Sequence, residues 1–265
     1  MLEISHVFKT FNPGPINEKA ALTDLQLHLE PGDFATVIGG NGAGKSTMLN
    51  VVSGTYSVDG GSISIGGEDV TKLPEYKRAG FLGRVFQDPM TGTAATMNIE
   101  ENMALANRRG KRRSPFRWGL TAQERRIFRD KLADLDLGLE NRMTSKVGLL
   151  SGGQRQALTL LMATLMRPKL LLLDEHTAAL DPKTAEKVLI LTRQLIRENG
   201  LTTLMVTHNM RDALAMGNRL IMMDEGHIVL DIRGEDKAKM TVSQLLERFG
   251  KVSGKALDND RMLLS

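Results

Sequence analysis

The sequence predicts an α/β protein whose sheet is mainly parallel and layered with helices. Short apolar runs with the length of strands alternate with segments whose apolar residues follow helical spacing. One run, residues 170–173, is leucine throughout, which is typical of a strand buried on both faces of a parallel sheet. Another, residues 34–38, leads directly into a glycine-rich stretch and then a helical pattern through Val52. These observations predict a core of strand, glycine-rich loop and helix.

The other expected elements surround this unit. In residues 25–29 leucine alternates with polar residues, so we expect a strand that is buried on one face. A helix should begin at Asp181, because an N-cap aspartate there precedes a proline, and should end near Glu198. Capping boxes are predicted for two more helices by Thr121 with Glu124 and by Thr241 with Gln244. The remaining strands are expected at residues 2–7, 202–207, 219–223 and 228–232, and further helices at 98–107, 121–137 and 209–216.

The middle of the chain, residues 88–165, is expected to form a mostly helical subdomain inserted into the α/β core. It contains a basic segment, residues 108–117, with six basic residues and no acidic one. After a main domain over residues 1–235, the sequence predicts a C-terminal helix and a polar, loosely ordered tail within residues 236–265.

The composition is that of an ordinary globular protein. Of the 265 residues, 41% are apolar and 25% are charged. The absence of cysteine excludes disulfides and thiolate metal sites, and it fits a cytosolic location. The longest nearly apolar stretch, residues 157–166, is shorter than the ~20 residues that span a bilayer, so a role in transport requires a partner. The net charge of +4 would suit nucleic acid or an anionic membrane surface, but much of it lies in the basic segment, which a solvated loop also explains.

The strongest signal for function is the sequence GGNGAGKST at residues 39–47. It matches the pattern G-x-x-x-x-G-K-[ST] in the strand-to-helix context that this pattern requires. Glycines let backbone N–H groups converge on an anion, and the helix N-terminus adds roughly half a positive charge. Lys45 is expected to neutralise the β- and γ-phosphates of ATP, and the Ser46 hydroxyl to bind Mg²⁺. The residues expected to hold the nucleotide here are Gly39, Asn41, Gly42, Ala43, Gly44, Lys45, Ser46 and Thr47.

Two acidic residues follow the leucine strand at 170–173. Asp174 is placed to hold Mg²⁺, through water, and Glu175 is the candidate general base for an attacking water. An Asp-Glu pair on its own is often only the end of a strand. A phosphate-binding loop in the same chain favours the catalytic interpretation.

A third motif, LLSGGQRQAL at residues 149–158, has two compatible interpretations. Ser151 and Gln154 form an S-x-x-Q capping box before an apolar helix. The glycines between them, Gly152 and Gly153, also make an anion-binding nest at the helix start. The same residues can therefore cap a helix and present its N-terminus to a phosphate.

With these motifs in this order, the main domain resembles an ABC ATPase. Gln87 in VFQDP resembles the Q-loop glutamine, Asp181 the D-loop aspartate and His208 in MVTHN the switch histidine. Phe11 occupies the place of the aromatic residue that stacks on adenine, with Phe8 as the neighbouring alternative. The resemblance implies a P-loop NTPase (RecA-like) core with an antiparallel β subdomain and an inserted α-helical signature subdomain.

The resemblance also implies a mechanism. Two copies of the chain would associate head to tail, with each phosphate-binding loop facing the SGGQ motif of the other copy. ATP bound between the copies would hold them together, and its hydrolysis would let them separate. One copy would contribute to each ATP the residues Lys45, Ser46, Gln87, Asp174, Glu175 and His208, with Mg²⁺ held by Ser46, Gln87 and Asp174. The other copy would contribute Ser151, Gly152, Gly153 and Gln154, with Asp181 at the interface. A homodimer with two competent sites is expected.

One residue departs from the family pattern, in which proline usually follows the catalytic glutamate. Here that residue is His176. A histidine would add a titratable side chain beside the site, and Glu175 is expected to remain the base.

The resemblance favours a peripheral subunit at the cytoplasmic face of the cell membrane that powers a transporter. The stretch TGTAATMNIEENMALA is similar to that of ATPases serving branched-chain amino-acid and related permeases. We therefore expect an importer of an amino acid or similar solute, a solute-binding protein in the full system, and permease docking at residues 87–105. An exporter ATPase is the alternative. A soluble mechanical ATPase acting on nucleic acid is a third, but the long coiled coil or second fused ATPase domain of such members is not seen, and no nucleic-acid partner is expected.

Overall fold

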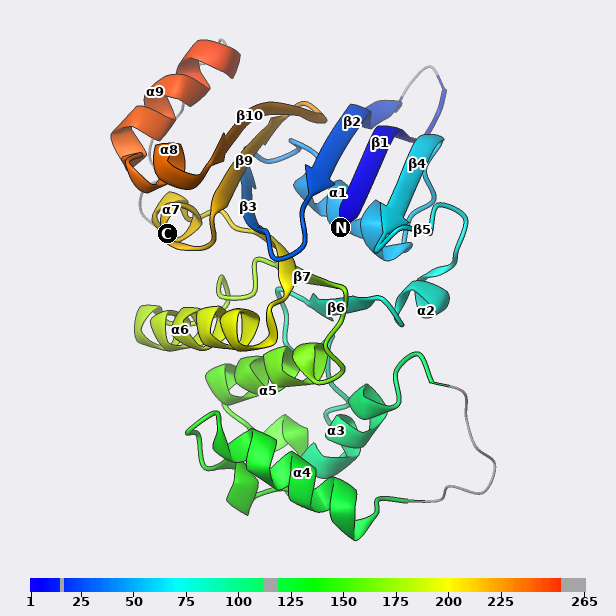
Figure 1. The fold of residues 1–265 in the computed structure, drawn as a ribbon, viewed down its shortest axis with the longest axis vertical. Coiled ribbons are helices and arrows are strands. Elements are labelled where there is room, and N and C mark those ends of the chain that lie inside the picture. Colours follow the sequence, from blue (N-terminus) through cyan, green and yellow to red (C-terminus); the bar gives the residue numbers. More distant parts are fainter. Residues whose placement is uncertain (15–16, 112–118, 254–265) are drawn as a thin grey trace. The chain divides into compact units, whose positions relative to one another are not determined.

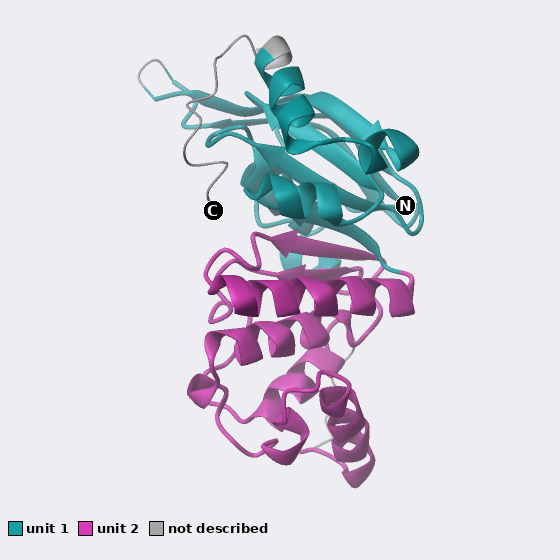
Figure 2. Ribbon diagram, turned by 90° about the vertical axis from the view of Figure 1, so that its left-hand side faces the viewer, with its two compact units in different colours: residues 1–78, 201–265 teal, residues 79–200 magenta. Residues whose placement is uncertain are grey.

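The computed structural model describes residues 1–14, 17–111 and 119–253. Part of the basic segment, residues 112–117, and most of the expected tail, residues 254–265, lie outside the described residues. The chain divides into two compact units, which Figure 2 shows in different colours. Unit 1 comprises residues 1–78 and 201–265, and unit 2 comprises residues 79–200.

Unit 1 contains an antiparallel four-stranded sheet (Figure 1). Its strands, in the order β2-β1-β4-β5, are β1 (Leu2–Phe11), β2 (Lys19–Leu29), β4 (Gly60–Ile65) and β5 (Glu68–Asp69). The leucines at positions 25, 27 and 29 are all buried, which confirms the strand predicted from their alternation. This sheet is the antiparallel β subdomain that the resemblance implied.

The second sheet of unit 1 contains the strand that leads into the phosphate-binding loop, β3 (Phe34–Gly39). It lies between β8 (Thr202–Val206) and β9 (Arg219–Asp224) and is parallel to both. The strand β10 (His227–Arg233) pairs antiparallel with β9, so the sheet is mainly rather than wholly parallel. All residues of β3 and β8 are buried, as is usual for strands of a parallel sheet.

The helices of unit 1 are α1 (Lys45–Ser53), α2 (Glu75–Arg78), α7 (Met210–Ala215), α8 (Gly234–Ala238) and α9 (Val242–Ser253). The predicted C-terminal helix is α9, and the expected pairing of Thr241 with Gln244 is present at its start. Its side chains Leu245 and Phe249 are buried in a cluster with Ile38 of β3 and residues of α7 and β9. This helix is therefore part of the core of unit 1.

Unit 2 combines a pair of parallel strands with helices. The strands are β6 (Leu82–Val85) and β7 (Leu170–Asp174). The helices are α3 (Ile99–Asn107), α4 (Ala122–Ala133), α5 (Gly152–Thr164) and α6 (Pro182–Asn199), with 3₁₀ turns at Leu139–Asn141 and Val147–Leu149. Helix α4 begins with the predicted capping box but ends four residues before the predicted position 137, because Asp136 adopts a left-handed backbone with φ of +52°.

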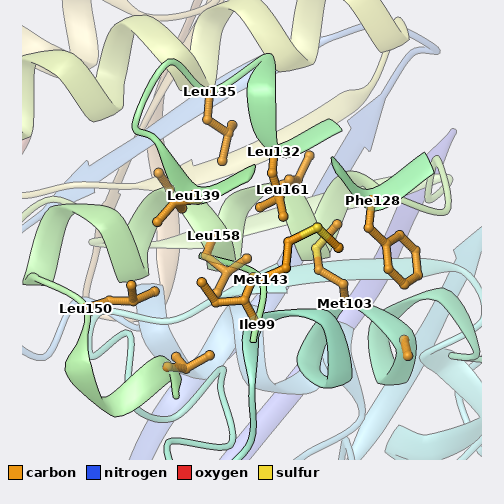
Figure 3. Close-up of a cluster of buried hydrophobic side chains, with 13 residues drawn as sticks. Ile99, Met103, Phe128, Leu132, Leu135, Leu139, Met143, Leu150, Leu158 and Leu161 are labelled. Atoms are coloured by element: carbon orange, nitrogen blue, oxygen red, sulfur yellow. The ribbon is translucent and has the colours of Figure 1, made fainter. Parts of the chain in front are cut away.

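A buried apolar cluster joins the helices of unit 2 (Figure 3). Phe128 and Leu132 come from α4, Met103 from α3, and Leu158 and Leu161 from α5. Each side chain of this size contributes about 1.5–3 kcal/mol when it is removed from water. The cluster holds α5, and with it the SGGQ motif, in a fixed position within this unit.

Among the residues that the structure describes, none of the helices combines the length and the apolar composition that crossing a membrane would require.

Candidate nucleotide-binding and catalytic site

The phosphate-binding loop connects β3 to α1 and packs too closely for side chains at two glycines. A β-carbon placed on Gly39 would lie 2.2 Å from the carbonyl oxygen of Met223, and one placed on Gly44 would lie 2.6 Å from that of Ala21. Gly44 also has a left-handed backbone, with φ of +98°. These two positions, the first and last glycines of the pattern, therefore require glycine.

The end of helix α1 at this loop is suited to an anion. No side chain caps the helix, and its first turn holds no acidic residue, so its N-terminal N–H groups and positive dipole end can interact with a phosphate. Lys45 is buried, and its Nζ donates to the carbonyl oxygens of Gly39 at 2.8 Å and Gly40 at 3.0 Å. The ammonium group is thus held in the loop, while Ser46 and Gly42 are exposed at its surface.

His208 lies at the same end of the sheet as this loop. Strand β8 is parallel to β3, with Val206 opposite Val37, and the N–H of Thr207 donates to the Val37 carbonyl at 3.1 Å. Asn209 then caps α7 by accepting from two backbone N–H groups. The turn that carries His208 is fixed on both sides, and unit 1 brings this histidine and the phosphate-binding loop to neighbouring strand ends.

Phe11, the expected adenine-stacking residue, ends strand β1 and belongs to an aromatic pair. Its ring makes an edge-to-face contact with Tyr56, with the ring centroids 5.2 Å apart. Lys9 Nζ lies 5.6 Å from the Phe11 ring centroid and pairs with Asp59 at 2.8 Å. The alternative, Phe8, is 41% exposed. The sequence did not predict the contact with Tyr56, because the two residues are 45 positions apart in the chain.

In unit 2, Gln87, Asp174 and Glu175 all lie at the C-terminal end of the strand pair. Val85 of β6 is opposite Leu173 of β7, so the residues that follow both strands emerge at the same end. Gln87 is exposed, and Asp174 and Glu175 are half-buried. Asp174 Oδ2 lies 3.5 Å from Arg84 Nη2.

Glu175 occupies a strained position on the loop after β7. Its φ of +46° lies in the left-handed region, which costs a non-glycine residue about 1–3 kcal/mol. The turn is closed by a hydrogen bond of 3.0 Å from the N–H of Ala178 to the Glu175 carbonyl. The proposed base is thus held in a defined backbone conformation.

The structure corrects the expectation that His176 adds a titratable side chain beside the site. The side chain is 1% exposed, and burial lowers its pKa to about 4, so it is neutral near pH 7. Its Nε2 is 3.0 Å from Thr192 Oγ1, and that hydroxyl donates to the Val188 carbonyl at 2.7 Å. Nε2–H is therefore the donor, and His176 ties the loop after β7 to α6.

The SGGQ motif forms the predicted capping box. Ser151 Oγ accepts from the N–H of Gln154 at 3.3 Å, and Gln154 Oε1 accepts from the N–H of Ser151 at 3.2 Å. Ser151 and Gly152 are exposed at the N-terminus of α5. Gly153 is packed against α6, since a β-carbon there would lie 2.3 Å from Thr184 Cγ2.

Asp181 is the predicted N-cap of helix α6. Its Oδ1 accepts from the N–H of Thr184 at 3.1 Å. Hydrogen bonds from the side chain and the backbone of Thr184 hold the pKa of Asp181 below its ordinary value. The carboxylate stays ionised and fixed at the start of the helix.

The donor set expected for Mg²⁺ consists of the Ser46 hydroxyl, the Gln87 amide and the Asp174 carboxylate, all hard oxygen ligands of the kind that this ion prefers. Within the described residues, no group of three His, Cys, Asp or Glu side chains forms a metal cluster. An ion that keeps water and phosphate ligands needs no such cluster. In their chemistry, the Ser46 hydroxyl of unit 1 and the Gln87 and Asp174 oxygens of unit 2 each suit Mg²⁺.

Comparison with known proteins identifies the family. Residues 22–178, more than half of the chain, match the family described as ABC transporter. The chain belongs to the ABC transporter family. It is an ATP-binding and ATP-hydrolysing subunit of the type that this family uses.

Several relatives align over nearly all of this ATPase. A tyrosine transport ATP-binding protein of Clostridioides difficile is 44% identical over 94% of this chain and 98% of its own length. A methionine import ATP-binding protein, MetN 2 of Enterococcus faecalis, is 32% identical over 94% of this chain and 70% of its own. The ABC transporter ATP-binding protein YxdL of Bacillus subtilis is 33% identical over 97% of this chain and 96% of its own.

Solved structures of ATP-binding cassettes share the fold. The dimeric cassette MJ0796 in a post-hydrolysis state, bound to ADP and Pi, superimposes with a TM-score of 0.73 at 29% identity and covers 88% of this chain and 98% of its own. The cassette MJ1267 gives a TM-score of 0.76 at 25% identity, over 96% of this chain and 97% of its own. These likenesses confirm the P-loop NTPase fold that the sequence predicted.

Proposed function

We propose that this ATPase energises an importer of an amino acid or a similar small organic solute. The observation that carries the proposal is the 44% identity to a tyrosine transport ATP-binding protein, over 94% of this chain and 98% of the relative. A methionine import protein among the relatives points to the same class of solute. On this basis we propose that the transported solute is an amino acid, and among amino acids we favour one with an aromatic side chain.

In the proposed ATPase cycle, each group performs the role that the family motifs imply. Lys45 and the N-terminus of α1 bind the β- and γ-phosphates, and Phe11 stacks on adenine. Glu175 orients and deprotonates the attacking water, while Gln87 and His208 contact the water and the γ-phosphate. Mg²⁺ held by Ser46, Gln87 and Asp174 would neutralise charge on the phosphates.

The working form that we propose is a head-to-tail homodimer in which Ser151, Gly152, Gly153 and Gln154 complete the site of the other copy. The dimeric cassette among the structural relatives supports this arrangement.

We also propose that residues 1–235 are the ATPase domain, that this domain contains the helical subdomain 88–165, and that it acts at the cytoplasmic face of the membrane. A solute-binding protein would deliver the amino acid.

The permease is proposed to dock on residues 87–105. A buried asparagine pins the loop in this segment: the amide of Asn102 donates to the Ala94 carbonyl at 3.1 Å and the Asn98 carbonyl at 3.0 Å, and accepts from the Ala94 N–H at 2.8 Å. Met90 is 44% exposed in the same segment. A rigid loop that presents an apolar side chain is suited to transmit force to a partner.

The proposal is tested by purifying a Glu175→Gln variant from its native membrane in ATP and Mg²⁺. This change removes the base but keeps the ATP-binding groups, so the closed dimer should accumulate with its permease attached. Glu186→Gln, which alters an exposed glutamate of α6, is the matched control and should hydrolyse ATP normally. Recovery of a polytopic permease, together with uptake of labelled tyrosine by cells that carry the system, is the expected result. Recovery of only soluble proteins or nucleic acid would contradict the proposal.

A further inference from the structure

We propose that Lys19 is a second cation of the nucleotide site and binds the phosphate chain of ATP beside Lys45. This inference rests on the phosphate-binding loop of unit 1 being the ATP site. The motifs assign no role to Lys19, which lies outside the loop and begins strand β2.

The path of β2 brings this lysine to the loop. A β-carbon on Gly44 would lie 2.6 Å from the Ala21 carbonyl oxygen and 3.1 Å from Leu22 Cδ2, so β2 runs directly alongside the start of α1. Further along, a β-carbon on Gly42 would lie 3.6 Å from Lys19 Nζ. The ammonium group is therefore in contact range of the exposed rim of the loop.

Lys19 also lies next to the expected adenine site. In the ladder between β1 and β2, Lys19 is the partner of Phe11. A nucleotide whose base stacks on Phe11 and whose terminal phosphates occupy the loop must pass between these two places. The Lys19 side chain extends from the first towards the second, and the intervening part of the ligand is its ribose and α-phosphate, next to the phosphates in the loop.

The charges around Lys19 favour an anion. Lys19 is exposed, and no carboxylate in the described parts of the chain forms an ion pair with it. Lys45 and the uncapped N-terminus of α1 are positive as well, so three positive groups converge with no acidic residue in the first helical turn to offset them. A polyanion such as a nucleoside triphosphate neutralises all three, and a charge-assisted bond from an ammonium to a phosphate is among the stronger polar contacts in proteins.

The test compares Lys19→Gln with Lys77→Gln in the full chain. Lys77 is an exposed lysine of the same unit, on α2, so both variants lose one positive charge. Binding of ATP, ADP and adenosine is measured by isothermal titration calorimetry, and thermal melting verifies folding. We expect Lys19→Gln to weaken ATP binding about three- to ten-fold, to weaken ADP binding less, and to leave adenosine binding unchanged. Lys19→Arg should bind ATP nearly as well as the wild type, and added salt should shrink the difference between wild type and Lys19→Gln.

Each other outcome contradicts a specific statement. Equal ATP affinity in Lys19→Gln and Lys77→Gln would overturn the role of Lys19 while leaving the loop as the ATP site. An equal loss of affinity for ATP and for adenosine would show that Lys19 acts through strand β1 and Phe11. That result would also overturn the proposed contact of Lys19 with the phosphates. Failure of the wild type itself to bind ATP would contradict the nucleotide site, and this inference with it.

Discussion

His176 donates a hydrogen bond to Thr192, with 3.0 Å between Nε2 and Oγ1, and so links the residue after the proposed base to the middle of α6. Both side chains are buried, at 1% and 0% exposure. Thr192 in turn donates to the Val188 carbonyl. At the position where the family resemblance led us to expect proline, a polar side chain therefore restrains the loop through a hydrogen bond.

Replacing Thr192 with valine should destabilise the protein. The change keeps the side-chain volume but leaves the buried Nε2–H of His176 without an acceptor, which costs about 1–3 kcal/mol of the free energy of unfolding. Urea unfolding measures this loss, and Thr144→Val, at an exposed threonine, is the control. In a double-mutant cycle with His176→Ala, the two losses should not add, since the second change removes the same hydrogen bond. Strict additivity would show that the bond contributes nothing.

Two matched capping boxes in unit 2 separate the structural from the functional role of Ser151. Thr121 caps α4 and Ser151 caps α5 with the same reciprocal bonds to a residue three positions on. Thr121→Ala and Ser151→Ala should each lower the free energy of unfolding by about 0.5–2 kcal/mol. Only Ser151→Ala should also reduce ATP hydrolysis by the purified dimer. Similar losses of hydrolysis in both variants would mean that Ser151 acts on activity through helix stability alone.

The features predicted most accurately from the sequence are local ones. The phosphate-binding loop, the caps at Thr121, Ser151 and Asp181, and the leucine strand β7 each depend on neighbours within a few positions. Such patterns are visible in the sequence because the interacting groups are close along the chain.

The features that escaped prediction depend on distant partners. Strand β4 was not predicted. It is short, it begins with two glycines, and it forms a strand through its pairing with β1. The burial of His176 depends on Thr192, and the aromatic contact of Phe11 depends on Tyr56. Nothing in the local sequence around His176 distinguishes a buried histidine from an exposed one.

Gly153 has a packing role that a substitution can reveal. A β-carbon at this position would meet Thr184 Cγ2 at 2.3 Å, so Gly153→Ala should force α5 and α6 apart and lower stability by about 1–3 kcal/mol. Thr184→Ser removes the methyl group that would clash, and Gly153→Ala combined with Thr184→Ser should recover most of the loss in urea unfolding. Gly152→Ala is the control, because its β-carbon would be 3.4 Å from its nearest neighbour, Leu180 Cδ2. An unrelieved loss in the double variant would place the strain elsewhere.

His28 should give the protein a small stabilisation in acid that disappears in base. Its ring nitrogens contact Glu3 and Glu30, the latter at 2.9 Å, and hydrogen bonds to Glu3 first and Glu30 second raise the pKa of His28. A folded-state pKa above the unfolded value means that this stabilisation is complete below the unfolded pKa, about 6.5, and is lost as the pH rises through the folded one. Because the three side chains are about half exposed, the gain should stay below about 1 kcal/mol. His28→Gln should therefore cost more free energy of unfolding at about pH 5.5 than at about pH 9, whereas the exposed His227→Gln serves as the control. A cost for His28→Gln that is the same at both pH values would contradict the charged pairing.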